Sequence, residues 1–159
     1  MAYTQLQIRK GQLTDLIELQ QLFVETVRTV CKVNYNRHQI DVWAASVDNK
    51  LRWLAIIEQQ FLLVACHQEK IVGFCSLTQL GCIDMLYVHK DWQRRGVAAQ
   101  LYSAIEKEAK QNGHKRLISE VSITAKPFFE RVGFSIETEQ TVVRNEVELT
   151  NYKMVKGLM

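Results

Sequence analysis

The fold of this chain is decided by the stretch MLYVHKDWQRRGVA, residues 85–98. It begins with apolar residues typical of a buried strand, continues through a polar turn and enters an amphipathic helix at Gly96. The first amides of a helix have no intrahelical acceptor and lie at the positive end of the helix dipole, so they can bind an anion. Gly96 lets the backbone approach closely, and Arg94 and Arg95 add positive charge. The stretch predicts a phosphate site, although a capped surface helix with a solvated basic turn would have the same pattern.

Hydrophobic patterns on both sides of this stretch predict the remaining elements. The expected strands are residues 6–9, 61–66, 71–77, 82–88, 117–121, 134–143 and 147–155. The expected helices are residues 16–30, 37–47, 96–111 and 124–131. The order βααβββαβαββ indicates an α+β fold, in which helices flank a mixed, mostly antiparallel sheet that has one parallel crossover.

The composition indicates a single domain over residues 1–159. The chain is 47 % hydrophobic, has one proline and contains no repetitive or linker-like stretch. Its first ten residues lack the basic-then-apolar pattern of a secretory signal, and no apolar window is long enough to cross a bilayer. We therefore expect a cytoplasmic protein that makes no membrane contact.

The charged and sulfur-containing residues predict neither a nucleic acid partner nor a metal. The formal net charge is +3 and the basic residues form no dense run. The cysteines lack CxxC spacing and lie in apolar surroundings, which favours buried, reduced thiols over metal ligands or disulfides. They are Cys31, Cys66, Cys75 and Cys82.

A second motif follows the first at a distance of one helix and one strand. The segment AKPFFERVGF, residues 125–134, closely resembles the A-x-x-x-[FY]-[YF]-E-x-x-G-F stretch of GNAT acetyltransferases. The loop QRRGVA, residues 93–98, is similar to the Q/R-x-x-G-x-G/A signature of the same family. The resemblance is strong over residues 71–136 and agrees in element order elsewhere.

The resemblance implies a GNAT-like sheet that is splayed in its middle, between the strands 82–88 and 117–121. The pantetheine arm of acetyl-CoA would lie in the gap and pair with the backbone of Leu86 and Val88, and the amides of residues 94–98 would hold the pyrophosphate. The cofactor-binding residues implied in this way are Leu86, Tyr87, Val88, Gln93, Arg94, Arg95, Gly96, Val97, Ala98, Ser122 and Phe129. The implied reaction moves an acyl group, above all acetyl, from acyl-CoA to a primary amine of a small molecule or peptide by direct attack. A homodimer follows only by analogy with similar folds.

Two carboxylates are candidates for the base that removes a proton from the acceptor amine. Asp84 lies in an otherwise apolar strand, where an unpaired charge is costly, and the resemblance implies a base on this strand. Its alternative role is to face solvent or to pair with a neighbouring cation. Glu120, near the end of the other splayed strand, is the second candidate because family members also place a base there. Its alternative role is a surface ion pair.

The sequence departs from the family pattern at two positions. Phe129 stands where many relatives carry a tyrosine that returns a proton to the coenzyme thiolate, and Ser122 stands where an asparagine is common. Because phenylalanine cannot donate a proton, Tyr87, Tyr35 or Tyr152 would have to do so, or the thiolate leaves unassisted. The departure keeps open a catalytically weak domain that binds acyl-CoA as a sensor. A further alternative is an unrelated α+β interaction module whose basic loop binds nucleic acid or protein.

The acceptor pocket is expected between the early helices and the last hairpin. Tyr35, His38, Trp43 and Trp53 could line it, but aromatic residues at helical spacing also pack into cores. His38 is a further candidate base, because a histidine can titrate near neutral pH.

Overall fold

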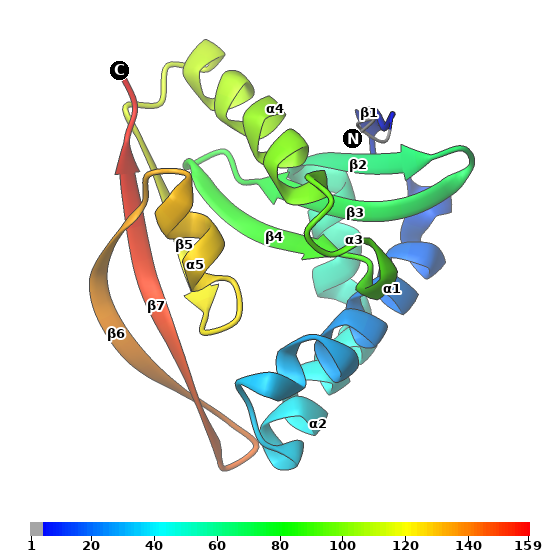
Figure 1. Cartoon of the computed structure of the whole chain (residues 1–159), viewed down its shortest axis with the longest axis vertical. Helices are drawn as coiled ribbons and strands as arrows, with labels where there is room; N and C mark the ends of the chain where they lie inside the picture. The colour runs from blue at the N-terminus through cyan, green and yellow to red at the C-terminus, as the bar shows by residue number, and fades with distance from the viewer. Residues whose placement is uncertain (1–4) are drawn as a thin grey trace.

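A seven-stranded sheet organises the part of the chain that the structure describes, residues 5–159. In this computed structural model the strand order is β1-β2-β3-β4-β5-β7-β6 (Figure 1). β4 and β5 run parallel, and the other neighbouring strands are antiparallel. The strands are β1 (Gln7–Lys10), β2 (Phe61–His67), β3 (Lys70–Leu77), β4 (Cys82–Val88), β5 (Arg116–Ser122), β6 (Ser135–Arg144) and β7 (Val147–Gly157). The prediction for the first ten residues falls partly on residues 1–4, outside the described residues.

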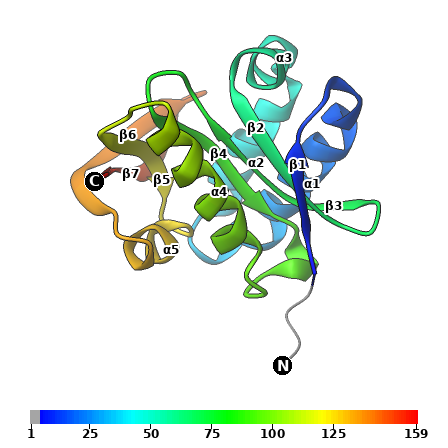
Figure 2. The same ribbon diagram turned by 90° about the horizontal axis from the view of Figure 1, so that it is seen from above.

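Five α-helices of the described residues cover the two faces of this sheet (Figure 2). They are α1 (Leu16–Thr29), α2 (Arg37–Ala45), α3 (Lys50–Gln59), α4 (Val97–Gln111) and α5 (Lys126–Arg131). The first three pack on one face, around a buried cluster that contains Phe23 and Trp53. The last two pack on the other face, around a cluster that contains Leu101 and Phe129. The α+β fold class predicted from the sequence is therefore confirmed.

The element order differs from the prediction by one helix, because the chain forms βαααβββαβαββ. The predicted order βααβββαβαββ missed α3, which follows a short turn after α2. Asn49 is the N-cap of α3, and its side chain accepts a hydrogen bond from the Arg52 amide. Trp53 and Ile56 then point one turn apart into the core, each 1 % exposed. The Asn49 cap and the apolar pair Trp53 and Ile56 are the local sequence signals of α3. The prediction grouped Trp53 with the other aromatic residues of the region and did not use it as part of a helical pattern.

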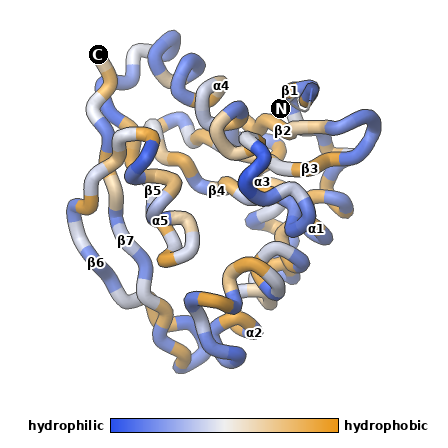
Figure 3. The backbone as a smooth tube through the Cα atoms, in the orientation of Figure 1, coloured by the Kyte–Doolittle hydropathy of each residue, from blue (hydrophilic) through white to orange (hydrophobic). Residues whose placement is uncertain are grey.

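Apolar residues concentrate on the central strands (Figure 3). β2 and β3 bury nearly all of their residues, because helices cover both faces of these strands. β6 is one of the two edge strands, and it leaves nearly every residue exposed. The core therefore lies on β2–β4, and the β6–β7 hairpin forms an outer wall.

The sheet opens between β4 and β5. The two strands pair only at Cys82 with Ile118 and at Ile83 with Ser119, and then diverge (Figure 1). β5 stays paired with β7 along its whole length, as far as Ser122. The resulting gap is closed at one end by the β4–β5 pairing and leads at the other end to the start of α4.

Candidate active site

The gap exposes backbone groups of β4. The His89 amide donates to the Val72 carbonyl at 2.8 Å, so this pair is hydrogen-bonded across β3 and β4. Bonded and non-bonded pairs alternate along an antiparallel ladder, and residues 87 and 89 consequently turn their backbone groups toward β3. Leu86 and Val88 turn theirs away from β3, into the gap. This is the placement that the resemblance implied for the two residues.

The Val88 carbonyl at the end of β4 is held by two side chains. Thr26 Oγ1 on α1 donates to it at 2.9 Å, and Gln93 Nε2 donates to it at 2.7 Å. Gln93 therefore ties the loop before α4 to β4, and Thr26 ties α1 to the same point. The N–H and C=O of Leu86 and the N–H of Val88 remain to pair with a ligand lying along β4.

The loop between β4 and α4 aims backbone amides at the mouth of the gap. Arg94 and Gly96 both adopt left-handed conformations, with φ of 57° and 81°. A non-glycine residue in this region costs about 1–2 kcal/mol, and such strain gathers at functional sites. Gly96 is the N-cap of α4, and no side chain caps the helix there. The first amides of α4 are therefore free to bind an anion.

The two arginines of this loop take different positions. Arg94 is exposed and lines the cavity described below. The Arg95 guanidinium lies 3.9 Å from the ring centre of Trp92, a cation–π contact, and Arg95 is not among the lining residues. The side chain of Arg95 thus holds the loop, whereas Arg94 supplies charge to the cavity.

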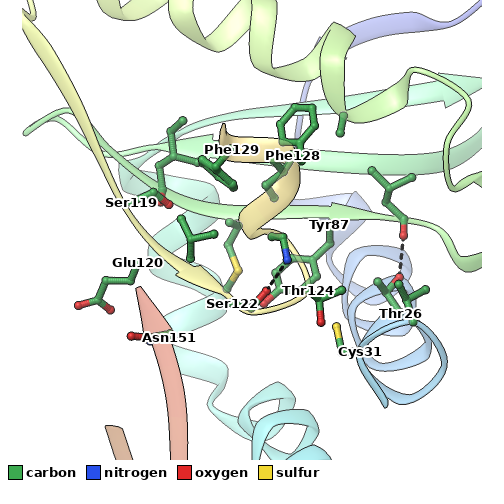
Figure 4. A pocket seen from close by; sticks show the side chains of 18 of the residues that line it. Thr26, Cys31, Tyr87, Ser119, Glu120, Ser122, Thr124, Phe128, Phe129 and Asn151 are labelled. Atoms are coloured by element: carbon green, nitrogen blue, oxygen red, sulfur yellow. Dashed lines mark hydrogen bonds between the residues drawn. The ribbon is translucent and has the colours of Figure 1, made fainter. Parts of the chain in front are cut away.

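A cavity of about 1170 Å³ extends from this loop through the gap to α1 and α2 (Figure 4). A drug-sized ligand occupies a pocket of roughly 300–1000 Å³, so this volume is large enough for two substrates. The predicted site residues that line it are Asp84, Leu86, Tyr87, Val88, Gln93, Arg94, Gly96, Val97, Ala98, Glu120, Ser122 and Phe129. The structure therefore brings together every predicted site residue except Arg95.

Asp84 is the extra residue of a β-bulge. Ser76 pairs with Met85 and Leu77 with Ile83, so Asp84 has no partner on β3. Both of its carboxylate oxygens are engaged. Arg52 donates to them at 2.9 and 3.3 Å, and Gln60 Nε2 donates at 2.7 Å. Asp84 thus pairs with a neighbouring cation, which is the alternative role considered for it.

Glu120 lies on β5 with its side chain exposed. It stands opposite Lys153 of β7, but the Lys153 ammonium pairs with Glu137 at 2.9 Å instead. Within residues 5–159, no cation lies within 4.0 Å of the Glu120 carboxylate. The surface ion pair considered for Glu120 is therefore not formed, and the carboxylate faces the cavity without a charged partner.

Tyr35 and Tyr152 are occupied elsewhere. The Tyr35 hydroxyl donates to the Thr150 carbonyl at 2.7 Å and accepts from the Ile123 amide at 2.9 Å. It joins β7 to the loop after β5, and both of its hydrogen-bonding roles are filled. The Tyr152 ring lies under the Lys126 ammonium at 4.9 Å, and Tyr152 is not among the cavity-lining residues.

The hydroxyl proton of Tyr87 takes part in no hydrogen bond of the described residues. Its hydroxyl accepts a hydrogen bond from Trp43 Nε1 at 3.3 Å, and it lines the cavity. Within residues 5–159 no group accepts a hydrogen bond from this hydroxyl. Burial raises the pKa of Tyr87 well above its usual value, so the hydroxyl stays protonated.

Phe129 and Ser122 have structural neighbours as well as cavity contact. Phe129 is 2 % exposed and packs edge-on against Phe134, with 5.0 Å between the two ring centres. Ser122 Oγ accepts from the Ala125 amide at 3.1 Å, which shapes the turn into α5. Of the aromatic residues expected in the acceptor pocket, Tyr35 and Trp43 line the cavity. His38 and Trp53 do not line it, and Trp53 belongs to the core.

Three polar residues of the site were missed by the sequence reasoning. Arg52 holds Asp84, Thr26 holds the end of β4, and Asn151 of β7 lines the cavity. Thr26 gave a usable signal, since it is a polar residue on the apolar stripe of α1. Arg52 and Asn151 gave none, because their roles depend on the packing of α3 and on the register of β7.

From residue 5 to residue 159, no helix combines the length and the apolar character needed to span a bilayer. In the same region, no three His, Cys, Asp or Glu side chains gather as metal ligands would.

Comparison with known proteins places this geometry among acetyltransferases. A family model described as an acetyltransferase (GNAT) domain matches residues 31–156. The uncharacterized N-acetyltransferase YafP of Escherichia coli K12 is 35 % identical over 149 residues, which are 94 % of each chain. A GCN5-related N-acetyltransferase from Rhodopseudomonas palustris superposes with a TM-score of 0.94 at 32 % identity over 99 % of both chains. The PaiA N-acetyltransferase of Thermoplasma acidophilum in complex with coenzyme A shares the fold, with a TM-score of 0.80 at 18 % identity over 97 % of this chain and 99 % of the other.

Proposed function

Because this chain belongs to the GNAT superfamily of N-acetyltransferases, we propose that it moves an acetyl group from acetyl-CoA to a primary amine of a small molecule or peptide. The observation that carries the proposal is the continuous path from the free amides of α4 to the open edge of β4. Phosphates fit the first part of this path, and an amide-bearing chain fits the second, like an added strand. The structure of a relative with coenzyme A bound supports the same ligand.

Each part of the path has a role toward acetyl-CoA. The amides of residues 96–98 and the Arg94 guanidinium would hold the pyrophosphate. The backbone groups of Leu86 and the Val88 amide would pair with the pantetheine arm. Acetyl-CoA supplies the activated thioester carbonyl. The protein would then orient this thioester carbonyl toward the part of the cavity that holds the acceptor.

Direct attack by the amine is favoured over transfer through a cysteine. Cys31 and Cys82 line the cavity, but burial raises the pKa of each thiol to about 11. A thiol with such a pKa is protonated at neutral pH and is a poor nucleophile. The acceptor amine is therefore proposed to attack the thioester itself.

We propose Glu120 rather than Asp84 as the base. A base needs a free lone pair aimed at the proton that it removes. The oxygens of Asp84 are filled by Arg52 and Gln60, whereas Glu120 faces the cavity without a cation. Asp84 instead fixes α3 to the bulge of β4.

Tyr87 is proposed as the donor that replaces the tyrosine missing at position 129. Tyr87→Phe is expected to lower kcat about a hundredfold while the Kd for acetyl-CoA stays unchanged, because it removes the donated proton. It also removes the acceptor of the Trp43 Nε1 hydrogen bond, so a modest fall in the melting temperature is expected beside the loss of rate. Steady-state kinetics and calorimetry on the same samples measure the two quantities. Tyr35→Phe should instead lower the melting temperature, since it removes two structural hydrogen bonds. An unchanged kcat in Tyr87→Phe would mean that the thiolate leaves unassisted.

The buried phenylalanine at position 129 favours a second candidate function, a weakly active domain that senses acyl-CoA. Calorimetric titration with acetyl-CoA, and separately with CoA, tests what the two candidates share. We expect saturable one-to-one binding. Thiol release from acetyl-CoA, measured across a panel of primary amines, then separates them. Amine-dependent release supports the transferase, binding without release supports the sensor, and no binding by folded protein contradicts both.

A further inference from the structure

A buried oxygen in the cavity wall has no partner. Asn151 Oδ1 is shielded from solvent, yet within residues 5–159 no group donates a hydrogen bond to it. Buried polar atoms are nearly always hydrogen-bonded, because an unmet acceptor loses its contact with water and gains nothing in return. Asn151 also lines the cavity, so a turn of its side chain brings this oxygen to a ligand there, and a donor on the ligand would satisfy it.

Asn151 and Glu120 lie on the same face of the sheet. β5 pairs with β7 so that Ser122 stands opposite Asn151 and Glu120 stands opposite Lys153. Glu120 and Asn151 are therefore diagonal neighbours across the two strands, within reach of one small group. Figure 4 shows both side chains at the same end of the pocket, far from Thr26.

This part of the wall offers two acceptors that no cation of the described residues occupies. The Lys153 ammonium forms an ion pair with Glu137 on β6, and the Ser122 hydroxyl oxygen already accepts a hydrogen bond from the Ala125 amide. The two groups that remain are a carboxylate without a cation and an amide oxygen without a donor. A primary ammonium group carries three donors and no acceptor, and it satisfies both.

We propose that Glu120 and Asn151 form the subsite that holds the acceptor amine as its ammonium ion, with Asn151 as a positioning residue. This inference rests on the proposed acetyl transfer. The ammonium gives one proton to the Glu120 carboxylate, and the nitrogen lone pair so released forms the bond to the thioester carbon. The carbon–sulfur bond breaks and its electron pair leaves with the coenzyme sulfur. As the amide forms, the nitrogen gives up a second proton to solvent, and the departing thiolate takes a proton from the Tyr87 hydroxyl, which solvent then reprotonates. Asn151 Oδ1 keeps its hydrogen bond to the nitrogen throughout, and so directs the lone pair.

The test compares two amines of similar shape. At neutral pH, para-methoxybenzylamine is an ammonium ion and para-methoxyaniline is uncharged. Calorimetry or ligand-observed NMR with the CoA-saturated protein should show binding of the benzylamine at least about tenfold tighter, as expected for a charge-assisted hydrogen bond. Equal affinity for both amines, or binding of neither, would overturn the subsite.

Variants of Asn151 separate an acceptor role from a merely structural one. Asn151→Leu should weaken benzylamine binding about tenfold or more, whereas Asn151→Asp, which keeps the oxygen, should retain it. The control is Gln140→Leu, since Gln140 pairs with Asn151 on β6 and is not among the cavity-lining residues. Unchanged binding in Asn151→Leu, or loss in Asn151→Asp, contradicts the assignment. If acetyl-CoA binds and amines are acetylated while these variants behave like wild type, only the subsite fails. If acetyl-CoA does not bind, the proposed function itself fails.

Discussion

Gly96→Glu is expected to abolish acetyl-CoA binding in a protein that remains folded. A Cβ added at Gly96 meets no atom within 4 Å, so the new side chain has room and projects where the pyrophosphate is expected. Its carboxylate would then occupy the amides of α4 and repel the phosphates. We expect the Kd for acetyl-CoA to rise more than a hundredfold, equivalent to about 3 kcal/mol of lost binding free energy. Calorimetry on the purified variant measures this change.

Gly113 provides a matched control for this substitution. It has the same φ of 81° as Gly96, and a Cβ there also meets nothing within 4 Å. Both variants therefore pay the same left-handed backbone cost, about 1–2 kcal/mol. Gly113 follows the C-terminal end of α4, where a negative charge opposes the helix dipole, whereas at Gly96 the dipole favours that charge. Gly113→Glu should thus be the less stable variant and still bind acetyl-CoA normally.

The two variants discriminate between a phosphate site and a merely capped helix. Loss of binding in the more stable variant cannot be ascribed to unfolding. If Gly96→Glu melts cooperatively and binds acetyl-CoA as wild type does, the loop does not hold the pyrophosphate. The pyrophosphate of acetyl-CoA would then have to bind elsewhere than at the start of α4.

The sheet and the cofactor loop could be predicted because their signals are local. The apolar run of β4, the polar turn and Gly96 follow one another within residues 85–98, and helix geometry alone makes the amides after Gly96 free. The loop's register against β4 depends on a hydrogen bond from Gln93 to a residue five positions earlier, which is local as well. Single-domain organisation, cytoplasmic location and a homodimer remain predictions.

The contacts of the polar residues on the β5–β7 side of the cavity and around Asp84 could not be predicted, because they form through tertiary packing. Asp84 pairs with Arg52 only because α3, the helix that was missed, packs against β2 and brings the Arg52 side chain to the bulge of β4. The two residues are 32 positions apart in the sequence. Asn151 faces the cavity only because β7 joins β5 in one register, and a shift by one residue would turn it to the opposite face. The sequence therefore proposed Asp84 as the first candidate base and Glu120 as the second, and the surroundings of the two carboxylates reverse that order.

Glu120→Gln is expected to have the second large effect, a loss of rate with the amine. Removal of a general base costs about 10²–10⁴-fold in rate, and we expect kcat/KM for the amine to fall by at least a hundredfold at neutral pH. Acetyl-CoA binding should not change, because Glu120 lies on the side of the cavity away from α4. The measurement is kcat/KM from thiol release over a range of pH, with the Kd for acetyl-CoA determined in parallel.

The pH dependence identifies the base. Below the pKa of an alkylamine, about 10, most of the acceptor is protonated and a base is needed, whereas near that pKa the free amine forms without help. The deficit of Glu120→Gln should therefore be largest at low pH and shrink as pH rises. Asp84→Asn leaves Arg52 and Gln60 without their anionic partner, so it should lower the melting temperature and reduce the rate by a factor that does not vary with pH. If Asp84→Asn instead shows the loss concentrated at low pH while Glu120→Gln is flat, Asp84 is the base. Its ion pair with Arg52 must then open when the acceptor binds.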